Sequence, residues 1–230
     1  PRKVGAELAV KKILVRDLKK AALKVDDPSV LTNDWKEILD DESIEIVVEV
    51  MGGMEPARTY MMEALAAGKN VVTANKDLMA ESGRELFDMA EQSQKDLLFE
   101  AAVAGGIPII SPLKQSLAGN HLTEIIGIVN GTTNFILTKM TSEGMEFNEA
   151  LSLATELGYA EADPTADVEG LDAGRKMAIM ASIAFNSRVT FRDVYTEGIT
   201  RITATDIRYA KEMGCDIKLL GVARNTQEGI

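Results

Sequence analysis

The stretch Ile44-Glu-Ile-Val-Val-Glu-Val-Met-Gly-Gly53 decides the fold of this chain. Its β-branched residues predict a buried strand, which the two glycines end. Turn residues and the spacing of apolar residues predict the other elements of this half, which are strands at residues 12–15, 70–73 and 96–99 and helices at residues 55–67 and 81–93. Because strands and helices alternate in this way, the sequence predicts an α/β fold with a doubly wound parallel sheet.

Polar residues and glycines follow the predicted strands, and in doubly wound sheets ligands bind at the carboxyl ends of the strands. Arg16-Asp17 offers a cation for a phosphate or an acid for a ribose hydroxyl, Gly52 lets backbone approach a ligand, and Lys76 places an ammonium group at a strand end. Each position also fits an ordinary turn. No G-x-G-x-x-G motif follows a strand, so either this is not a dinucleotide fold or the chain begins inside one.

Composition limits the kinds of partner. The 230 residues are 46% hydrophobic, which is enough for a sizeable core, and the net charge is -11, which argues against nucleic acid or an anionic membrane. No apolar run approaches the roughly 20 residues of a membrane span and no signal pattern opens the chain, so a cytoplasmic protein with small-molecule ligands is expected. A single cysteine and a single histidine exclude an internal disulfide and a His/Cys metal site.

The second half combines helices with strands that favour a mixed sheet. A strand is expected at residues 122–129, followed by a helix that Asn130 caps, and a helix over 149–157 stops at Gly158. The acidic segment that follows ends in Asp172 and Lys176, which are four residues apart and therefore share one helix face. This segment predicts either the polar wall of an active site or a solvated acidic loop that caps a helix.

Four motifs resemble, in order, the signatures of the homoserine dehydrogenase family: Thr73-Ala-Asn-Lys76, Glu100-Ala-Ala-Val-Ala-Gly-Gly-Ile-Pro-Ile-Ile110, Gly127-Ile-Val-Asn-Gly-Thr-Thr-Asn134 and the segment from Gly158 to Lys176. The resemblance implies a Rossmann-like NAD(P)-binding domain, incomplete here, over residues 1–104. It implies an α+β catalytic and dimerisation domain on a mixed sheet over 105–230. The family's glycine-rich first unit would precede Pro1, and its closing segment would follow Ile230.

The resemblance also implies a reaction, which is the NAD(P)-dependent interconversion of L-homoserine and L-aspartate 4-semialdehyde on the route to threonine, methionine and isoleucine. Lys176 matches the family's proposed proton donor and Lys76 its second active-site lysine, and the sequence leaves open which of the two moves the proton. A lysine can transfer a proton where burial brings its neutral form within reach of working pH. Glu161 is expected to hold the substrate ammonium group, with Asp167 and Asp172 as polar neighbours.

Cofactor and cation contacts follow from the same resemblance. NADP(H) or NAD(H) is expected to contact Lys76, Gly158, Gly52, Asn75 and Arg16, with Arg16 favouring a 2′-phosphate and its neighbour Asp17 opposing it. A sodium ion is expected at the side chain of Glu100 and at three backbone carbonyls, those of Val103, Gly105 and Ile107. The alternative for Glu100 is that it caps a neighbouring helix.

Two other functions stay open at this point. The chain could belong to another nicotinamide-dependent reductase that acts on a related semialdehyde or amino acid. It could also be a cofactor-free binding or assembly module, which the missing glycine loop would favour. The family resemblance further implies a homodimer or higher homo-oligomer, joined through the sheet of the second half.

Overall fold

The computed structural model describes residues 5–230, so the opening of the chain at Pro1 lies outside the described residues. The chain divides into two compact units. The first unit comprises Pro1–Thr73 and Gly83–Leu98, and the second comprises Ala74–Ser82 and Phe99–Ile230.

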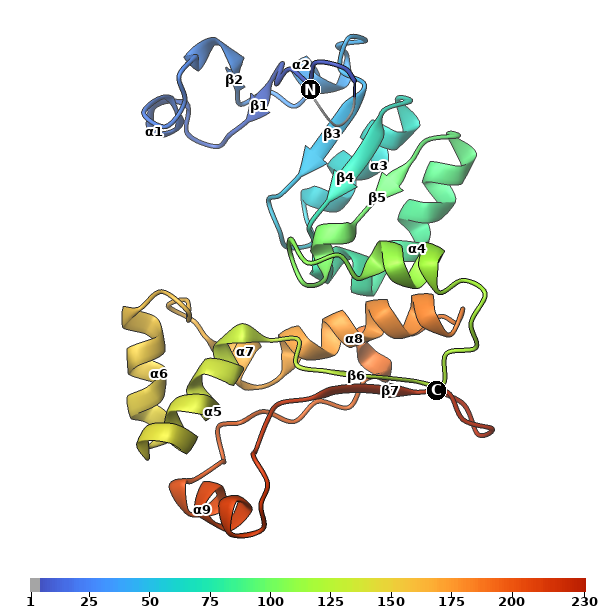
Figure 1. The fold of residues 1–230 in the computed structure, drawn as a ribbon. Helices are drawn as coiled ribbons and strands as arrows, with labels where there is room; N and C mark the ends of the chain where they lie inside the picture. Colours follow the sequence, from blue (N-terminus) through green and yellow to red (C-terminus); the bar gives the residue numbers. More distant parts are fainter. Residues whose placement is uncertain (1–4) are drawn as a thin grey trace. The chain divides into compact units, whose positions relative to one another are not determined.

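Parallel strands form the first unit (Figure 1). In chain order its elements are β1 (Ile13–Leu14), α1 (Leu18–Ala22), a 3-10 turn (Pro28–Val30), β2 (Leu31–Thr32), α2 (Lys36–Leu39), β3 (Ile46–Glu49), α3 (Ala57–Ala66), β4 (Asn70–Thr73), the later part of α4 (Lys76–Gln92) and β5 (Leu97–Leu98). β1 pairs with β2, and β3, β4 and β5 form a separate sheet in that order, with Val47 opposite Val71 and Val71 opposite Leu97. The predicted parallel α/β fold is confirmed.

Helix α3 packs against β3 and β4 through the residues that helical spacing predicts to be apolar. Ala57, Met61, Ala64 and Leu65 are all fully buried, and Val71 of β4 is buried beneath them. Helix α4 begins at Lys76 rather than at residue 81, because Asn75 caps it and thereby moves its start back to the end of β4.

The second unit is mainly helical, with one antiparallel strand pair. Its elements after the first turns of α4 are two short helical turns (Glu100–Ala102 and Pro112–Ser116), β6 (Glu124–Gly127), α5 (Gly131–Glu143), α6 (Phe147–Glu156), α7 (Thr165–Val168), α8 (Leu171–Ala184), a 3-10 turn (Phe191–Asp193), α9 (Ala204–Glu212) and β7 (Gly221–Arg224). β6 and β7 pair antiparallel. A mixed sheet was expected in this half, but within residues 5–230 its sheet consists of this antiparallel pair and contains no parallel pair.

Two contacts organise this unit. Helices α5, α6 and α9 enclose a core that includes Ile136, Leu137 and Met140, all of which are almost completely buried. Helix α8 packs on β7, where Gly221 approaches Met177 so closely that a Cβ at position 221 would lie 2.5 Å from its sulfur atom. Helix α8 is therefore largely buried, and it carries Asp172 and Lys176.

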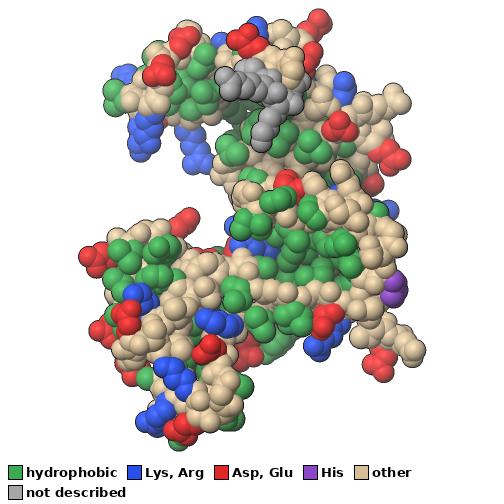
Figure 2. All heavy atoms as spheres, viewed as in Figure 1, with side chains coloured by type: hydrophobic (Ala, Val, Ile, Leu, Met, Phe, Trp, Pro, Cys, Tyr) green, Lys and Arg blue, Asp and Glu red, His purple; other side chains and the backbone are tan. Residues whose placement is uncertain are grey.

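Acidic and basic side chains are interspersed on the face of the molecule drawn in Figure 2. The histidine, His121, is exposed, and its purple side chain is visible there. Cys215 is free and exposed. Among residues 5–230, none of the helices combines the length and the apolar character needed to cross a bilayer.

Candidate active site

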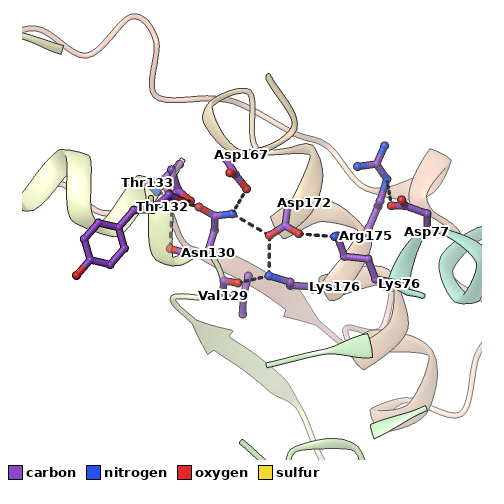
Figure 3. Close-up of polar contacts among 11 residues, drawn as sticks. Lys76, Asp77, Val129, Asn130, Thr132, Thr133, Asp167, Asp172, Arg175 and Lys176 are labelled. Carbon is purple, nitrogen blue, oxygen red and sulfur yellow. Dashed lines mark hydrogen bonds and ion pairs between the residues drawn. The ribbon is translucent and has the colours of Figure 1, made fainter. Parts of the chain in front are cut away.

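Lys76 and Lys176 meet at one carboxylate, that of Asp172 (Figure 3). The ammonium nitrogen of Lys176 lies 2.6 Å from Oδ2 of Asp172, and that of Lys76 lies 3.3 Å from Oδ1. The Asp172 side chain is 7% exposed, against 17% for Lys176 and 34% for Lys76. The predicted pairing of Asp172 with Lys176 is confirmed, and the structure adds Lys76 from a different helix.

The start of α8 places this carboxylate. Gly170 precedes the helix with φ +77, and a Cβ there would lie 3.0 Å from the carbonyl oxygen of Glu197. Glycine adopts this left-handed conformation without strain, which lets the chain turn directly into α8. Asp172 then falls in the first helical turn, where the helix dipole favours an anion, and Lys176 falls one turn later on the same face.

Asn130 links this pair to the rest of the unit, and the sequence analysis did not predict it as a site residue. Its side-chain amide donates to Oδ1 of Asp167 at 2.7 Å and to Oδ2 of Asp172 at 2.8 Å. Its side-chain oxygen accepts from the backbone N–H of Thr133 at 2.9 Å, which caps α5 as predicted. The capping signal was visible in the sequence, but nothing local indicated the two carboxylates.

The electrostatic balance of the cluster favours an ionised Asp172. Burial acts to raise the pKa of this carboxyl, but hydrogen bonds from Lys176 and Asn130 and the charges of the two lysines outweigh burial and hold the pKa below its usual range. Two ammonium groups thus pair with the carboxylate of Asp172, and the carboxylate of Asp167 joins the cluster through the Asn130 amide. Charges that would be costly to bury alone are paired here.

Lys76 reaches the cluster because of its place at the start of α4. The side-chain oxygen of Asn75 accepts from the backbone N–H of Leu78 at 3.0 Å, and Asn75 is buried. This cap fixes the first turn of α4. Lys76 is the first residue of that turn, so its ammonium group is delivered to Asp172 of α8.

Two other predicted residues of the second unit lie outside these contacts. Glu161 is exposed, and in the described part of the chain it makes none of the hydrogen bonds or ion pairs that join the cluster. Gly158 has φ +78, is exposed, and follows the end of α6. The structure therefore brings together Lys76, Asp167, Asp172 and Lys176 but does not join Glu161 or Gly158 to them.

The first unit contains the remaining cofactor candidates. Gly52 and Gly53 follow β3 with φ +74 and +72, and a Cβ at either position would meet nothing within 4 Å, which leaves open space beside the backbone. Arg16 is exposed between β1 and α1, whereas Asp17 caps α1 by accepting from the N–H of Lys20.

Glu49 shapes the loop that contains Gly52, and the sequence analysis did not predict it. Although it is 4% exposed, its Oε1 accepts from the backbone N–H groups of Met51 and Gly52, and its Oε2 accepts from the hydroxyl of Thr73 at 2.6 Å. A buried, hydrogen-bonded carboxylate of this kind holds the backbone at the end of β3 in one conformation.

Glu100 was expected either to bind a cation or to cap a helix. In the structure its side chain caps the helical turn Pro112–Ser116. Oε1 accepts from the N–H groups of Ile109 and Ile110, and Oε2 accepts from the N–H and the hydroxyl of Ser111, just before the helical turn at Pro112. Burial acts to raise the pKa of this carboxyl, but the hydrogen bonds from Ser111, Ile109 and Ile110 outweigh burial and hold the pKa below its usual range. A carboxylate offers about four acceptor positions, and these four hydrogen bonds fill them. This side chain as placed therefore does not fit a cation ligand.

Comparison with protein families identifies both halves of the chain. Residues 108–229 match the family model described as homoserine dehydrogenase. Residues 2–100 match the model described as homoserine dehydrogenase, NAD binding domain. The two models together account for most of the sequence.

Individual relatives agree with the family models. The chain is 53% identical over 216 residues to a homoserine dehydrogenase of Synechocystis, covering 94% of this chain and 50% of the relative. It is 50% identical to that of Bacillus subtilis, covering 96% of this chain and 51% of the relative. The chain thus spans about half the length of the curated relatives it matches.

Solved structures have the same fold. A homoserine dehydrogenase from Thiobacillus denitrificans is similar with a TM-score of 0.91 and 48% identity, over 94% of this chain and 50% of that one. A hyperthermophilic archaeal homoserine dehydrogenase in complex with NADPH is similar with a TM-score of 0.73 and 28% identity, over 90% of this chain and 62% of that one.

Proposed function

The chain belongs to the homoserine dehydrogenase family, and from that membership we propose that the protein containing it interconverts L-homoserine and L-aspartate 4-semialdehyde, with a nicotinamide dinucleotide as redox partner. The observation that carries the proposal is the meeting of Lys76 and Lys176 at Asp172. We further propose that residues 1–104 form the cofactor-binding domain and residues 105–230 the domain that binds homoserine.

The nicotinamide cofactor, when bound, accepts or supplies the hydride at C4 of the substrate. The open backbone at Gly52, held by Glu49, supports a cofactor contact there. Arg16, Asn75, Lys76 and Gly158 are the other proposed contacts. The exposed Arg16 would favour NADP(H) and its neighbour Asp17 is already engaged as a helix cap, so we propose NADP(H) as the better partner and NAD(H) as the poorer one.

The chain itself must move the proton of the C4 hydroxyl, and the donors of Lys176 support its role. A lysine ammonium has three N–H donors. Lys176 gives one to Oδ2 of Asp172 at 2.6 Å and one to the carbonyl oxygen of Val129 at 2.7 Å. These two bonds fix the direction of the third donor, which is left for the substrate oxygen. Lys76, paired with the other oxygen of Asp172, would orient the hydroxyl group.

The acidic residues would bind the amino-acid end of the substrate. Asp167 uses Oδ1 to accept from Asn130 and is only partly buried, so Oδ2 can face a substrate ammonium group. The exposed Glu161 is proposed as a second anion for that ammonium group, which it would approach when substrate is bound. An alcohol without a charged amino group would lose both interactions.

Cation binding, assembly and location remain proposals as well. Within residues 5–230, the backbone carbonyl oxygens of Val103, Gly105 and Ile107 accept no hydrogen bond. These free carbonyls support a sodium site made of backbone oxygens, without the Glu100 side chain. A homodimer or higher oligomer is supported by the apolar outer face of β6 and β7, where the exposed Ile126 lies opposite Val222.

We propose that the protein acts in the cytoplasm, in threonine, methionine and isoleucine synthesis.

The decisive test uses the full-length gene product. Purified protein should reduce NADP⁺ or NAD⁺ when L-homoserine is added, followed by nicotinamide absorbance, and should do so far more slowly with L-serine or n-propanol. Activity with another amino-acid alcohol but not with homoserine would point to a related reductase. Absence of dinucleotide binding by calorimetry would point to a binding module and would contradict the proposal.

A further inference from the structure

A second ion pair joins the same two helices beside the proposed catalytic lysines. Asp77 follows Lys76 in the first turn of α4, and Arg175 precedes Lys176 in α8. Nε of Arg175 lies 3.1 Å from Oδ1 of Asp77 (Figure 3). The charges are crossed, because α4 contributes the cation to the pair with Asp172 and the anion to the pair with Arg175. Sliding or turning α4 along α8 would break both pairs at once.

Phe191 holds Arg175 in place. The guanidinium carbon of Arg175 lies 5.0 Å from the centre of the Phe191 ring, which is within the range of a cation–π interaction. The ring can come this close because residue 174 is glycine. A Cβ at Gly174 would lie 2.9 Å from Cε2 of Phe191 and 2.6 Å from the methyl group of Thr196. The missing side chain thus permits the contact that fixes Arg175.

The pair is more than an ordinary surface ion pair. Exposed pairs contribute little, because water competes for both partners. Oδ1 of Asp77, however, is closed off from water and has no hydrogen bond in the described structure. Its ion pair with Arg175 therefore offsets the cost of removing this charged oxygen from water. Removing Arg175 would leave a buried carboxylate oxygen uncompensated, which the first turn of α4 would relieve by moving.

We propose that Asp77 and Arg175 are positioning residues, which hold the first turn of α4 on α8 so that the ammonium group of Lys76 faces Asp172. This inference rests on the proposed function only for its effect on turnover. Neither residue needs to touch the substrate. Their effect is transmitted through Lys76, which is the neighbour of Asp77 in the sequence.

The activity test is a double-mutant cycle in the full-length protein. Asp77→Asn should lower kcat for homoserine oxidation about 10-fold, the cost of a small displacement of a reacting group, and Asp77→Glu should restore most of it. In a Lys76→Ala background, Asp77→Asn should cost nothing further. Glu143→Gln, which breaks the Lys139–Glu143 pair on α5, is the matched control and should leave kcat unchanged. Equal losses from Asp77→Asn in both backgrounds would overturn the proposal.

A second readout does not depend on enzymatic activity. Amine acylation of Lys76, followed by mass spectrometry under native conditions, should become about two- to fivefold faster in Asp77→Asn and in Arg175→Gln, the change expected when an ion pair is lost. It should not change in Glu143→Gln. Unchanged acylation of Lys76 in both variants would also overturn the inference. Faster acylation in a protein that does not oxidise homoserine would contradict the proposed function and leave the positioning of Lys76 standing.

Discussion

Asp172 uses its two oxygens for two different lysines. Oδ2 accepts from Lys176 and from Asn130, and Oδ1 faces Lys76. A neutral side chain of the same shape could satisfy the hydrogen bonds only in part and could not balance the two ammonium charges. The charge of this one residue is therefore the condition for bringing both lysines to one place.

The pH dependence of stability tests this role. The folded pKa of Asp172 lies below its ordinary value of about 3.9, so the unfolded chain binds the proton first as pH falls. Its contribution to the free energy of unfolding is complete above the unfolded pKa and is lost as pH falls through the folded pKa.

Asp172→Asn should therefore lower the unfolding free energy at neutral pH by about 3 kcal/mol and flatten its decline in acid, as measured by urea denaturation at several pH values. Asp163→Asn, which changes an exposed aspartate of the preceding loop, serves as the control and should have a small effect. Parallel acid profiles for Asp172→Asn and the unmodified protein would refute this role.

Proton transfer by Lys176 predicts a specific kinetic defect. Lys176→Ala should lower kcat about 10² to 10⁴-fold, the usual contribution of a positioned acid or base, while the Kd for the dinucleotide changes little. Stopped-flow turnover and calorimetric titration of the full-length protein measure the two quantities. Lys139→Ala on α5 is the matched control. Comparable losses in turnover and cofactor affinity would assign Lys176 to binding instead.

Spacing along the chain predicted only part of this cluster. Asp172 and Lys176 are four apart in one helix, so periodicity alone placed them together. Family resemblance added Lys76 and Asp167. Asn130 was predicted only as a helix cap, because its second task depends on carboxylates from distant segments that no local pattern records.

At the scale of elements, helix starts determine the geometry of the site. Asn75 begins α4, Asn130 begins α5 and Gly170 begins α8, and these starts position Lys76, the linking amide and Asp172. The strand 70–73 was predicted with its observed bounds. The start of α4 was predicted too late, because the polar residues of its first turn, which pair with α8, weaken the apolar periodicity.

The cap of α4 can be tested against a cap elsewhere in the same unit. Asn75→Ala should lower the unfolding free energy by about 1 kcal/mol and also reduce turnover, since the first turn carries Lys76. Asn75→Asp, which keeps an acceptor, should retain most of the stability. Thr203→Ala removes the cap of α9 and should cost a similar stability without the loss of turnover. Equal turnover in Asn75→Ala and Thr203→Ala would contradict the argument.

At the scale of the whole molecule, the compact units do not follow the order of the chain. The second unit includes residues 74–82, which lie in sequence between two parts of the first. The sequence predicts a single domain boundary after residue 104. No local pattern indicates that residues 74–82 join the second unit, because their ion pairs with α8 form between segments about 100 residues apart in the chain, through Lys76 and Asp77. The division into cofactor and substrate domains stays a prediction.

The proposed sodium site predicts cation-dependent stability of the full-length protein. At a sodium concentration about tenfold above Kd, ligand linkage adds about 1.4 kcal/mol to the free energy of unfolding, so the thermal midpoint should exceed that in choline chloride of equal ionic strength. Glu100→Gln should lower the midpoint in both salts but keep the difference between them, because the side chain caps a helix. Identical midpoints of the unmodified protein in the two salts would exclude the site.

The double task of Asn130 has a consequence for chemical ageing. Asn-Gly is the sequence most prone to loss of ammonia through a succinimide ring, and Gly131 follows Asn130 here. In the native chain both ends of the Asn130 side-chain amide are hydrogen-bonded: the NH₂ group donates to Asp167 and the oxygen accepts from Thr133. Gly131 also belongs to α5, so closure of the succinimide ring is hindered. Unfolding removes this protection. After refolding, the product would place a third carboxylate beside those of Asp167 and Asp172. Peptide mapping should find isoaspartate at this position forming faster in denatured than in native protein; equal rates would show that the fold offers no such shelter.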